Sequence, residues 1–169
     1  MLNKKIQDAL NKQINYELYS AYLYLSMSAY FEDLNLAGFA NWMRDHFQEE
    51  TMHAMKIFDY INQRGGHVEL SEIAKPDHTW KSAQDVFTNT LKHEQFITSL
   101  INGLVNLARE EKDHATESFL QWYVNEQVEE EATVNDILQQ LKLIKDNTGA
   151  LLMLDKELKT TINAQTTTQ

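Results

Sequence analysis

The sequence predicts an all-α protein: a four-helix bundle with one long crossover connection and a short fifth helix near the C-terminus. The chain of 169 residues contains one proline and five glycines, so few residues interrupt helices. Long stretches repeat apolar residues at spacings of three and four, the period of a helix that buries one stripe. At this length we expect a single domain over residues 1–169, with the bundle at about residues 4–145.

The first two expected helices form a hairpin. The first covers about residues 4–32, and a tight break over residues 33–35 follows it. We expect Asn35 to cap the second helix, because asparagine accepts hydrogen bonds from the free N–H groups of a first turn. The second helix runs to Gln63 and Arg64 and ends at Gly65-Gly66, since glycine readily adopts the left-handed conformation after a helix.

The next helices form a second hairpin. Ser82 is the expected N-cap of a third helix that reaches about Glu111, and a short turn over residues 112–114 precedes a fourth helix at about residues 115–145. After a break at residues 146–149, an apolar fifth helix is expected at about residues 150–158. The Thr- and Gln-rich residues 160–169 are expected to be frayed.

The connection between the hairpins constrains the topology. Residues 67–81 include Pro76 and show no sustained period, so they read as a long loop. An extended segment of about 16 residues reaches roughly 50 Å, slightly more than the length of the neighbouring helices at about 1.5 Å per residue. We therefore expect a crossover that joins parallel second and third helices. A merely flexible loop is the alternative.

Polar residues occupy the centres of stripes that are otherwise apolar. At about 1.5 Å per residue, all of them lie roughly 21–29 Å from their hairpin turns, so parallel hairpins bring them to one level. They are Glu17 in the first helix, Glu50 and His53 in the second, Glu94 in the third, and Gln127 and Glu130 in the fourth.

A metal cluster is the simplest explanation for this level. The stripe centres hold no Lys or Arg, and packed carboxylates lose several kcal/mol each on desolvation unless a cation neutralises them. Carboxylates with imidazole suit iron or manganese. Glu50 can bridge two metals, with Glu17 and His53 completing one site and Glu94 and Glu130 the other; Gln127 is a weak ligand or a neighbour. His46, also on a stripe, reads as a satisfied core histidine.

Composition excludes several other classes. Fifteen Lys and Arg against 25 Asp and Glu give a formal net charge of −10, which disfavours nucleic-acid binding and favours the attraction of cations. No cysteine is present, so thiolate zinc sites, iron–sulfur clusters and disulfides are excluded. The N-terminus carries no secretory signal and no segment is apolar enough to span a membrane, so the cytoplasm is the expected location.

The chain resembles the bacterial non-haem ferritins over essentially its whole length. The resemblance is carried by residues 15–22 (NYELYSAY), residues 49–54 (EETMHA), Glu94, and residues 126–131 (EQVEEE). It implies a hollow shell of 24 identical subunits that oxidises Fe(II) with O2 or H2O2 and stores a ferric mineral.

The same resemblance implies a role for each residue of the site. Glu17, Glu50 and His53 hold one iron, and Glu50, Glu94 and Glu130 the second, with Gln127 beside them. It also implies a third iron site and a redox-active tyrosine, Tyr24, with Trp122 as a possible neighbour; core packing explains these two aromatics equally well. The residues matching the third site are Glu49, Glu126, Glu129 and Glu130.

Related proteins match less well. Bacterioferritins carry a haem-ligating methionine where Thr51 stands, and a second Glu-x-x-His motif where this chain reads Gln127-Val128-Glu129-Glu130, so haem is not expected. The DNA-protecting relatives lack a fifth helix. Two alternatives stay open: a storage shell without a catalytic centre, and a di-iron enzyme that oxidises an organic substrate.

Overall fold

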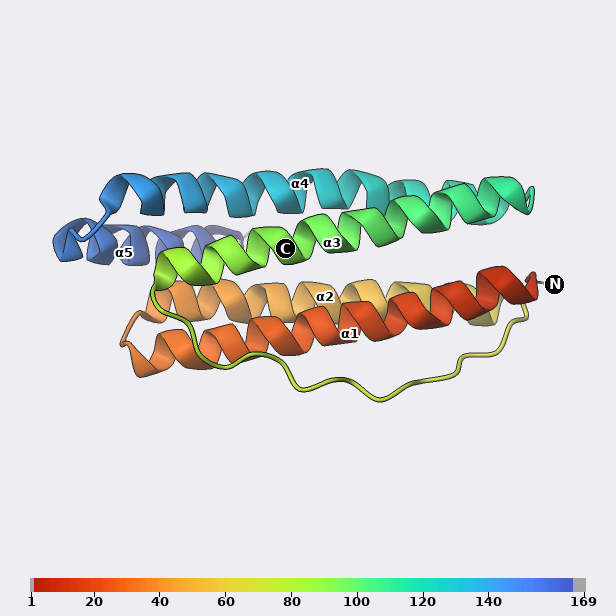
Figure 1. Cartoon of the computed structure of the whole chain (residues 1–169), viewed down its shortest axis with the longest axis horizontal. Coiled ribbons are helices and arrows are strands. Elements are labelled where there is room, and N and C mark those ends of the chain that lie inside the picture. The colour runs from red at the N-terminus through yellow and green to blue at the C-terminus, as the bar shows by residue number, and fades with distance from the viewer. Residues whose placement is uncertain (1, 166–169) are drawn as a thin grey trace.

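The computed structural model describes residues 2–165 of the chain and the side chains of residues 2–159. Long helices pair into two hairpins, α1 with α2 and α3 with α4, and α5 packs against α2 and α4 (Figure 1). None of the described helices combines the length and apolar character needed to cross a bilayer. The predicted all-α bundle is confirmed, and its helices are α1 (Lys4–Asp33), α2 (Ala37–Gln63), α3 (Ala83–Glu110), α4 (His114–Ile144) and α5 (Thr148–Gln165).

The connection from α2 to α3 is the predicted crossover. In Figure 1 it leaves one end of the bundle, runs beside α1 and reaches the other end. Side chains of α1 hold it by hydrogen bonds to its backbone: Asn11 donates to the His67 carbonyl at 3.0 Å, and Ser26 donates to the Asp77 carbonyl at 2.7 Å. The crossover is therefore attached along α1, and α2 and α3 run parallel.

Three local residues were predicted to cap or terminate helices, and two of these predictions are confirmed. The Ser82 hydroxyl accepts from the Asp85 N–H at 3.1 Å at the start of α3, and Gly65 adopts φ +67° after α2, as predicted. The prediction for Asn35 is wrong. Asn35 has φ +57° and its N–H donates to the Glu32 carbonyl, so it terminates α1 instead of capping α2.

The start of α2 is capped from α5. Its own N-cap residue, Leu36, offers no side-chain hydrogen bond, whereas Asp155 Oδ1 accepts from the Phe39 N–H at 3.0 Å. The two helices are so close that a Cβ on Gly38 would lie 1.7 Å from the Asp155 carbonyl oxygen. A carboxylate at a helix N-terminus also interacts favourably with the helix dipole. This contact fixes α5 against the bundle.

The fifth helix is longer than predicted. It begins at Thr148, where Asn147 Oδ1 accepts from the Ala150 N–H at 3.1 Å, and it extends to Gln165. The expected end at residue 158 is therefore wrong, because no glycine or proline interrupts the helix after Gly149. The expected fraying of residues 160–165 stays a prediction. The rest of the expected frayed tail, residues 166–169, lies outside the described residues.

The core consists of two apolar clusters with a polar layer between them. One cluster surrounds Phe31, Phe39 and Phe87 near the α1–α2 turn. The other surrounds Leu10, Ile57 and Leu120 toward the opposite end. Each contains buried residues from all four bundle helices. The polar layer is therefore supported on both sides by rigid packing.

A pair of glycine substitutions tests the docking of α5. Gly38→Ala forces a methyl group into the Asp155 backbone, so we expect it to destabilise the protein by about 1–3 kcal/mol and to speed hydrogen exchange in α5. Gly103→Ala, in the middle of α3, meets no atom within 4 Å and should stabilise the protein by about 0.5–1 kcal/mol. Melting temperatures at equal protein concentration measure both. Stabilisation by both variants would contradict the docked position of α5.

Candidate metal centre

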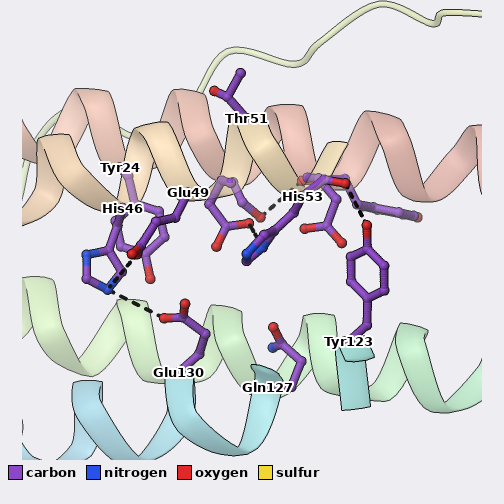
Figure 2. A network of polar contacts seen from close by, with 12 residues as sticks. Tyr24, His46, Glu49, Thr51, His53, Tyr123, Gln127 and Glu130 are labelled. Atoms are coloured by element: carbon purple, nitrogen blue, oxygen red, sulfur yellow. Dashed lines mark hydrogen bonds and ion pairs between the residues drawn. The ribbon is translucent and has the colours of Figure 1, made fainter. Parts of the chain in front are cut away.

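The layer between the two apolar clusters contains the six polar residues that the sequence singled out. All are buried, with exposed fractions of 1–6%. They come from four different helices: Glu17 from α1, Glu50 and His53 from α2, Glu94 from α3, and Gln127 and Glu130 from α4. Figure 2 shows the His53 side chain of α2 pointing across the bundle toward Gln127 and Glu130 of α4.

Three of these residues form a compact group of possible metal ligands. One ligand atom from each of Glu17, Glu50 and His53 lies within 4.8 Å of the other two. His53 Nδ1 is 3.6 Å from Glu50 Oε2, because residues three apart on a helix share a face. Gln13, one turn before Glu17, donates from Nε2 to Glu17 Oε1 at 2.9 Å. Gln13 was not among the site residues predicted from the sequence.

Glu94 and Gln127 are linked beside this group. Glu94 Oε1 accepts from the Tyr24 hydroxyl at 2.7 Å, and Glu94 Oε2 accepts from Gln127 Nε2 at 3.2 Å. Within the described residues, Glu94 belongs to no set of three possible ligand atoms within 4.8 Å of one another. The second predicted metal position, between Glu50, Glu94 and Glu130, therefore stays a prediction.

Glu130 is shared between two further groups. Its carboxylate lies 3.5 Å from His46 Nε2, and His46 and Glu49 together with Glu130 form one set of possible ligands. His53, Glu126 and Glu130 form the other. His46 Nδ1 donates to the Trp42 carbonyl at 2.9 Å, so the ring is satisfied on one side, as the sequence suggested, while Nε2 faces the two carboxylates (Figure 2).

The ionisation of the cluster reflects crowding of buried acids. Burial raises the pKa of Glu50 well above its ordinary value, and the charges of Glu94, Glu17 and Glu130 raise it further. Burial likewise raises the pKa of Glu94 to about 7. Burial also raises the pKa of Glu17, although its hydrogen bond with Gln13 opposes this. These carboxyl groups lack a neutralising partner.

The pKa values of three neighbouring groups shift in other directions. Burial lowers the pKa of His53 to about 4, so its imidazole is neutral and able to act as a ligand. Burial would raise the pKa of Glu130, but its contact with His46 outweighs this and lowers it. Burial opposes protonation of His46, but Glu130 and Glu49 overcome it and raise the His46 pKa.

One atom of the cluster indicates what is needed there. Glu50 Oε1 is the single buried side-chain oxygen or nitrogen without a hydrogen-bond partner in the part of the chain that the structure describes. An unpartnered buried carboxylate oxygen is costly, whereas a cation would satisfy it. It belongs to the residue that the sequence predicted to be the bridging ligand. The residues present therefore fit a bound cation.

A second, open site adjoins the buried one. A pocket of about 390 Å³ lies between α2 and α4, and Leu158 of α5 is part of its lining. It collects all four residues that match the expected third iron site, Glu49, Glu126, Glu129 and Glu130. Asp45 and Asp136 add two further carboxylates to its lining. The electrostatic field of this pocket favours cations.

The remaining aromatic and haem-related positions are also defined. Tyr24 is buried, with its ring 5.2 Å from that of His46. Trp122 stands edge-on to the His53 ring at 5.2 Å and has the Lys56 ammonium 3.9 Å above its own ring. Thr51 donates to the Phe47 carbonyl of its own helix at 2.8 Å, and in Figure 2 it points away from the cluster.

The fold and the site define an all-α bundle whose facing helices converge on a carboxylate–histidine cluster. A model of the ferritin-like domain family matches residues 7–144. The chain is 45% identical over 159 residues to the bacterial non-heme ferritin of Campylobacter jejuni, covering 94% of this chain and 95% of that protein. It is 41% identical over 158 residues to that of Bacteroides fragilis, with 94% and 98% covered.

Solved structures agree with the sequence relatives. An open pore ferritin from the archaeon Archaeoglobus fulgidus superimposes with a TM-score of 0.92 at 52% identity, covering 94% of this chain and 98% of that chain. A closed form of the same ferritin, engineered by mutagenesis, gives 0.93 at 52% identity, with 94% and 96% covered. The chain belongs to the ferritin family.

Proposed function

We propose that this ferritin oxidises Fe(II) at the buried cluster and stores the Fe(III) product. Membership of the ferritin family supports iron storage and a homo-oligomeric assembly. The observation that carries the oxidation step is the polar layer itself, in which buried carboxylates from all four bundle helices surround an unpartnered Glu50 oxygen. A purely structural polar layer would contain paired charges, since buried ions without partners destabilise a fold.

Each of the two proposed iron positions has its own set of ligands, and Glu50 belongs to both. Glu17, Glu50 and neutral His53 bind one Fe(II), and Glu50, Glu94 and Glu130 bind the second, with Gln127 orienting Glu94. A site rich in oxygen ligands stabilises Fe(III) relative to Fe(II), so it makes the bound Fe(II) a stronger reductant. Two Fe(II) ions give one electron each to O2, which takes up two protons and leaves as H2O2.

Tyr24 is the proposed redox-active side chain beside this centre. Its hydroxyl donates to Glu94 Oε1 at 2.7 Å, so it positions that ligand and lies close enough to give one electron to the oxidant at the centre, with its phenol proton passing to the Glu94 carboxylate. Burial raises its pKa well above the ordinary value for tyrosine, and the charge of Glu94 adds to this, so the phenol stays protonated and remains a donor.

The first test is addition of about two Fe(II) per subunit to metal-free protein in air, followed by rapid absorbance and O2-uptake measurements. We expect oxidation far faster than in protein-free buffer, followed by ferric product. Oxidation at the protein-free rate would contradict the catalytic centre and favour the pure storage shell. Rapid O2 uptake only in the presence of an added organic substrate would favour the oxygenase alternative.

The open pocket is the proposed third iron site, so removing carboxylates from its lining should lower the number of Fe(II) ions bound per subunit. Glu49→Ala combined with Glu129→Ala removes two carboxylates from its lining, so anaerobic Fe(II) titration should fall from about three to about two ions per subunit. Fast oxidation of the first two ions should persist. Glu110→Ala combined with Glu157→Ala, two exposed acids outside the pocket, is the matched control. Unchanged stoichiometry in the pocket variant would contradict a third site there.

A further inference from the structure

A second pocket lies on a different side of the bundle and has the opposite character. It encloses about 230 Å³ between α1, α3 and the crossover. Its lining contains no carboxylate, no lysine and no arginine, in contrast with the acidic pocket between α2 and α4. The lining residues are Asn15, Tyr16, Tyr19, Ala74, His93 and Phe96.

A hydrogen bond links the lining of this pocket to the buried face of the helix that carries Glu17. His93, which lines the pocket, has its Nε2 2.7 Å from the hydroxyl oxygen of fully buried Ser20. Ser20 lies on the buried face of α1, one turn after Glu17 and one turn before Tyr24. His93 directly precedes Glu94 on α3. The Ser20–His93 contact therefore joins α1 to α3 at the level of the metal ligands.

The volume of the pocket and the chemistry of its lining limit which molecules it can hold. A water molecule takes up about 30 Å³ of liquid volume, so the pocket accommodates several small molecules. It is below the roughly 300–1,000 Å³ of sites that bind drug-sized organic ligands. Tyr16, Tyr19 and Phe96 give it aromatic walls, which favour uncharged guests over hydrated ions.

We propose that the α1–α3 pocket is the route by which the uncharged oxidant, O2 or H2O2, reaches the metal centre, and that the Ser20–His93 hydrogen bond is its gate. The inference rests on the proposed oxidation of Fe(II) at the buried cluster. It separates two substrates by charge: Fe(II) approaches through the acidic pocket between α2 and α4, and the oxidant through the neutral pocket between α1 and α3. Separate routes keep the oxidant away from Fe(II) that is not yet bound at the metal centre.

The test measures access without the oxidation chemistry. Nitric oxide is uncharged, similar in size to O2, and binds Fe(II). It is mixed anaerobically with the assembled Fe(II)-loaded protein, and formation of the nitrosyl complex is followed by stopped-flow absorbance. Ala74→Phe fills the pocket from the exposed crossover without disturbing the core, and Ile73→Phe adds the same ring next to it, outside the lining.

We expect nitrosyl formation to be about tenfold slower in Ala74→Phe and unchanged in Ile73→Phe, with anaerobic Fe(II) binding equal in both. Ser20→Ala removes the hydrogen bond and should speed nitrosyl formation. Equal rates for Ala74→Phe and the unmodified protein would overturn the route, and an unchanged rate in Ser20→Ala would overturn the gate. If the unmodified protein forms no nitrosyl complex, the metal centre itself is refuted, and the route with it.

Discussion

Replacing Glu50 and His53 together by alanine is expected to reduce the rate of Fe(II) oxidation to that of protein-free buffer while the protein still folds and assembles. Loss of even an outer-shell partner lowers metal affinity or activity about 10–100-fold, so loss of two ligands should exceed about 100-fold. Glu50 contributes to both predicted iron positions, and His53 is the only nitrogen in the Glu17–Glu50 group. The variant therefore affects both positions at once.

Folding should survive this change because the two apolar clusters lie on either side of the site. The substitution also removes Glu50 Oε1, a buried oxygen without a hydrogen-bond partner, whose desolvation costs stability. The matched control is Glu110→Ala with His114→Ala, which removes the same residue types from exposed positions. Circular dichroism and size-exclusion chromatography check folding and assembly. Loss of assembly only in the cluster variant would show that the cluster is structural, and fast oxidation in that variant would contradict the site.

The metal-free protein is expected to lose stability as the pH rises from about 6.5 to about 8.5, and added Zn(II) should restore it. In this range the folded state holds protons that the unfolded state has released, because burial raises the pKa of Glu94 from 4.5 to about 7 and that of Glu50 well above 4.5. When the folded state binds more protons, the free energy of unfolding falls with increasing pH. For Glu94 this loss of stability, on the order of 3 kcal/mol in all, falls mostly between pH 4.5 and about 7, so Glu50 and His46 carry most of the change above pH 7.

Other groups set the lower limit of this pH range. Burial lowers the pKa of His53 and His93 from 6.5 to about 4, so the folded state binds fewer protons there and stability rises with pH between those values. Above about pH 6.5 that contribution is nearly complete. The raised pKa of His46, due to Glu130 and Glu49 against the effect of burial, adds to the loss of stability at higher pH. The two histidines therefore oppose Glu94 and Glu50 between about pH 4.5 and 6.5, and the loss of stability is unopposed only above about pH 6.5.

Thermal unfolding of the metal-free protein over this pH range measures the effect. Zn(II) does not undergo redox chemistry, and it competes with protons for carboxylate and imidazole ligands, so its stabilisation should grow with pH. Glu50→Gln removes one of the titrating groups and should flatten the pH dependence. A metal-free protein whose melting temperature rises steadily up to about pH 8.5 would contradict the buried acidic cluster.

The local sequence was sufficient for most of the fold. Four stripes of apolar residues, interrupted at matching depths, defined the bundle helices and the level of the polar layer. The prediction failed where a boundary depends on distant residues. Asn35 looked like a cap, yet the start of α2 is capped by Asp155, which lies 116 residues beyond Phe39. No local pattern reports a cap supplied by another helix.

For the candidate site, spacing and residue type identified the polar side chains but not which of them lie together as groups of possible metal ligands. Glu130 is on the predicted stripe, but only the packed structure turns it toward His46 and makes it common to two groups of possible ligands. Gln13 and His46 each precede a predicted ligand by one turn, which is the signal that sequence reasoning could have used for both. His93 and Ser20, from helices far apart in sequence, gave no such signal.

The sequence by itself determined that this is a helical bundle with buried carboxylates at one level, because helix periodicity converts residue spacing into position on a face and depth along an axis. The resemblance it carries also identified the ferritin family. Only the tertiary structure decided which oxygen is left without a partner, how α5 closes the end of α2, and that an acidic and a neutral pocket open on different sides of the centre. These properties depend on distances between side chains of separate helices, which packing sets and spacing along one chain does not.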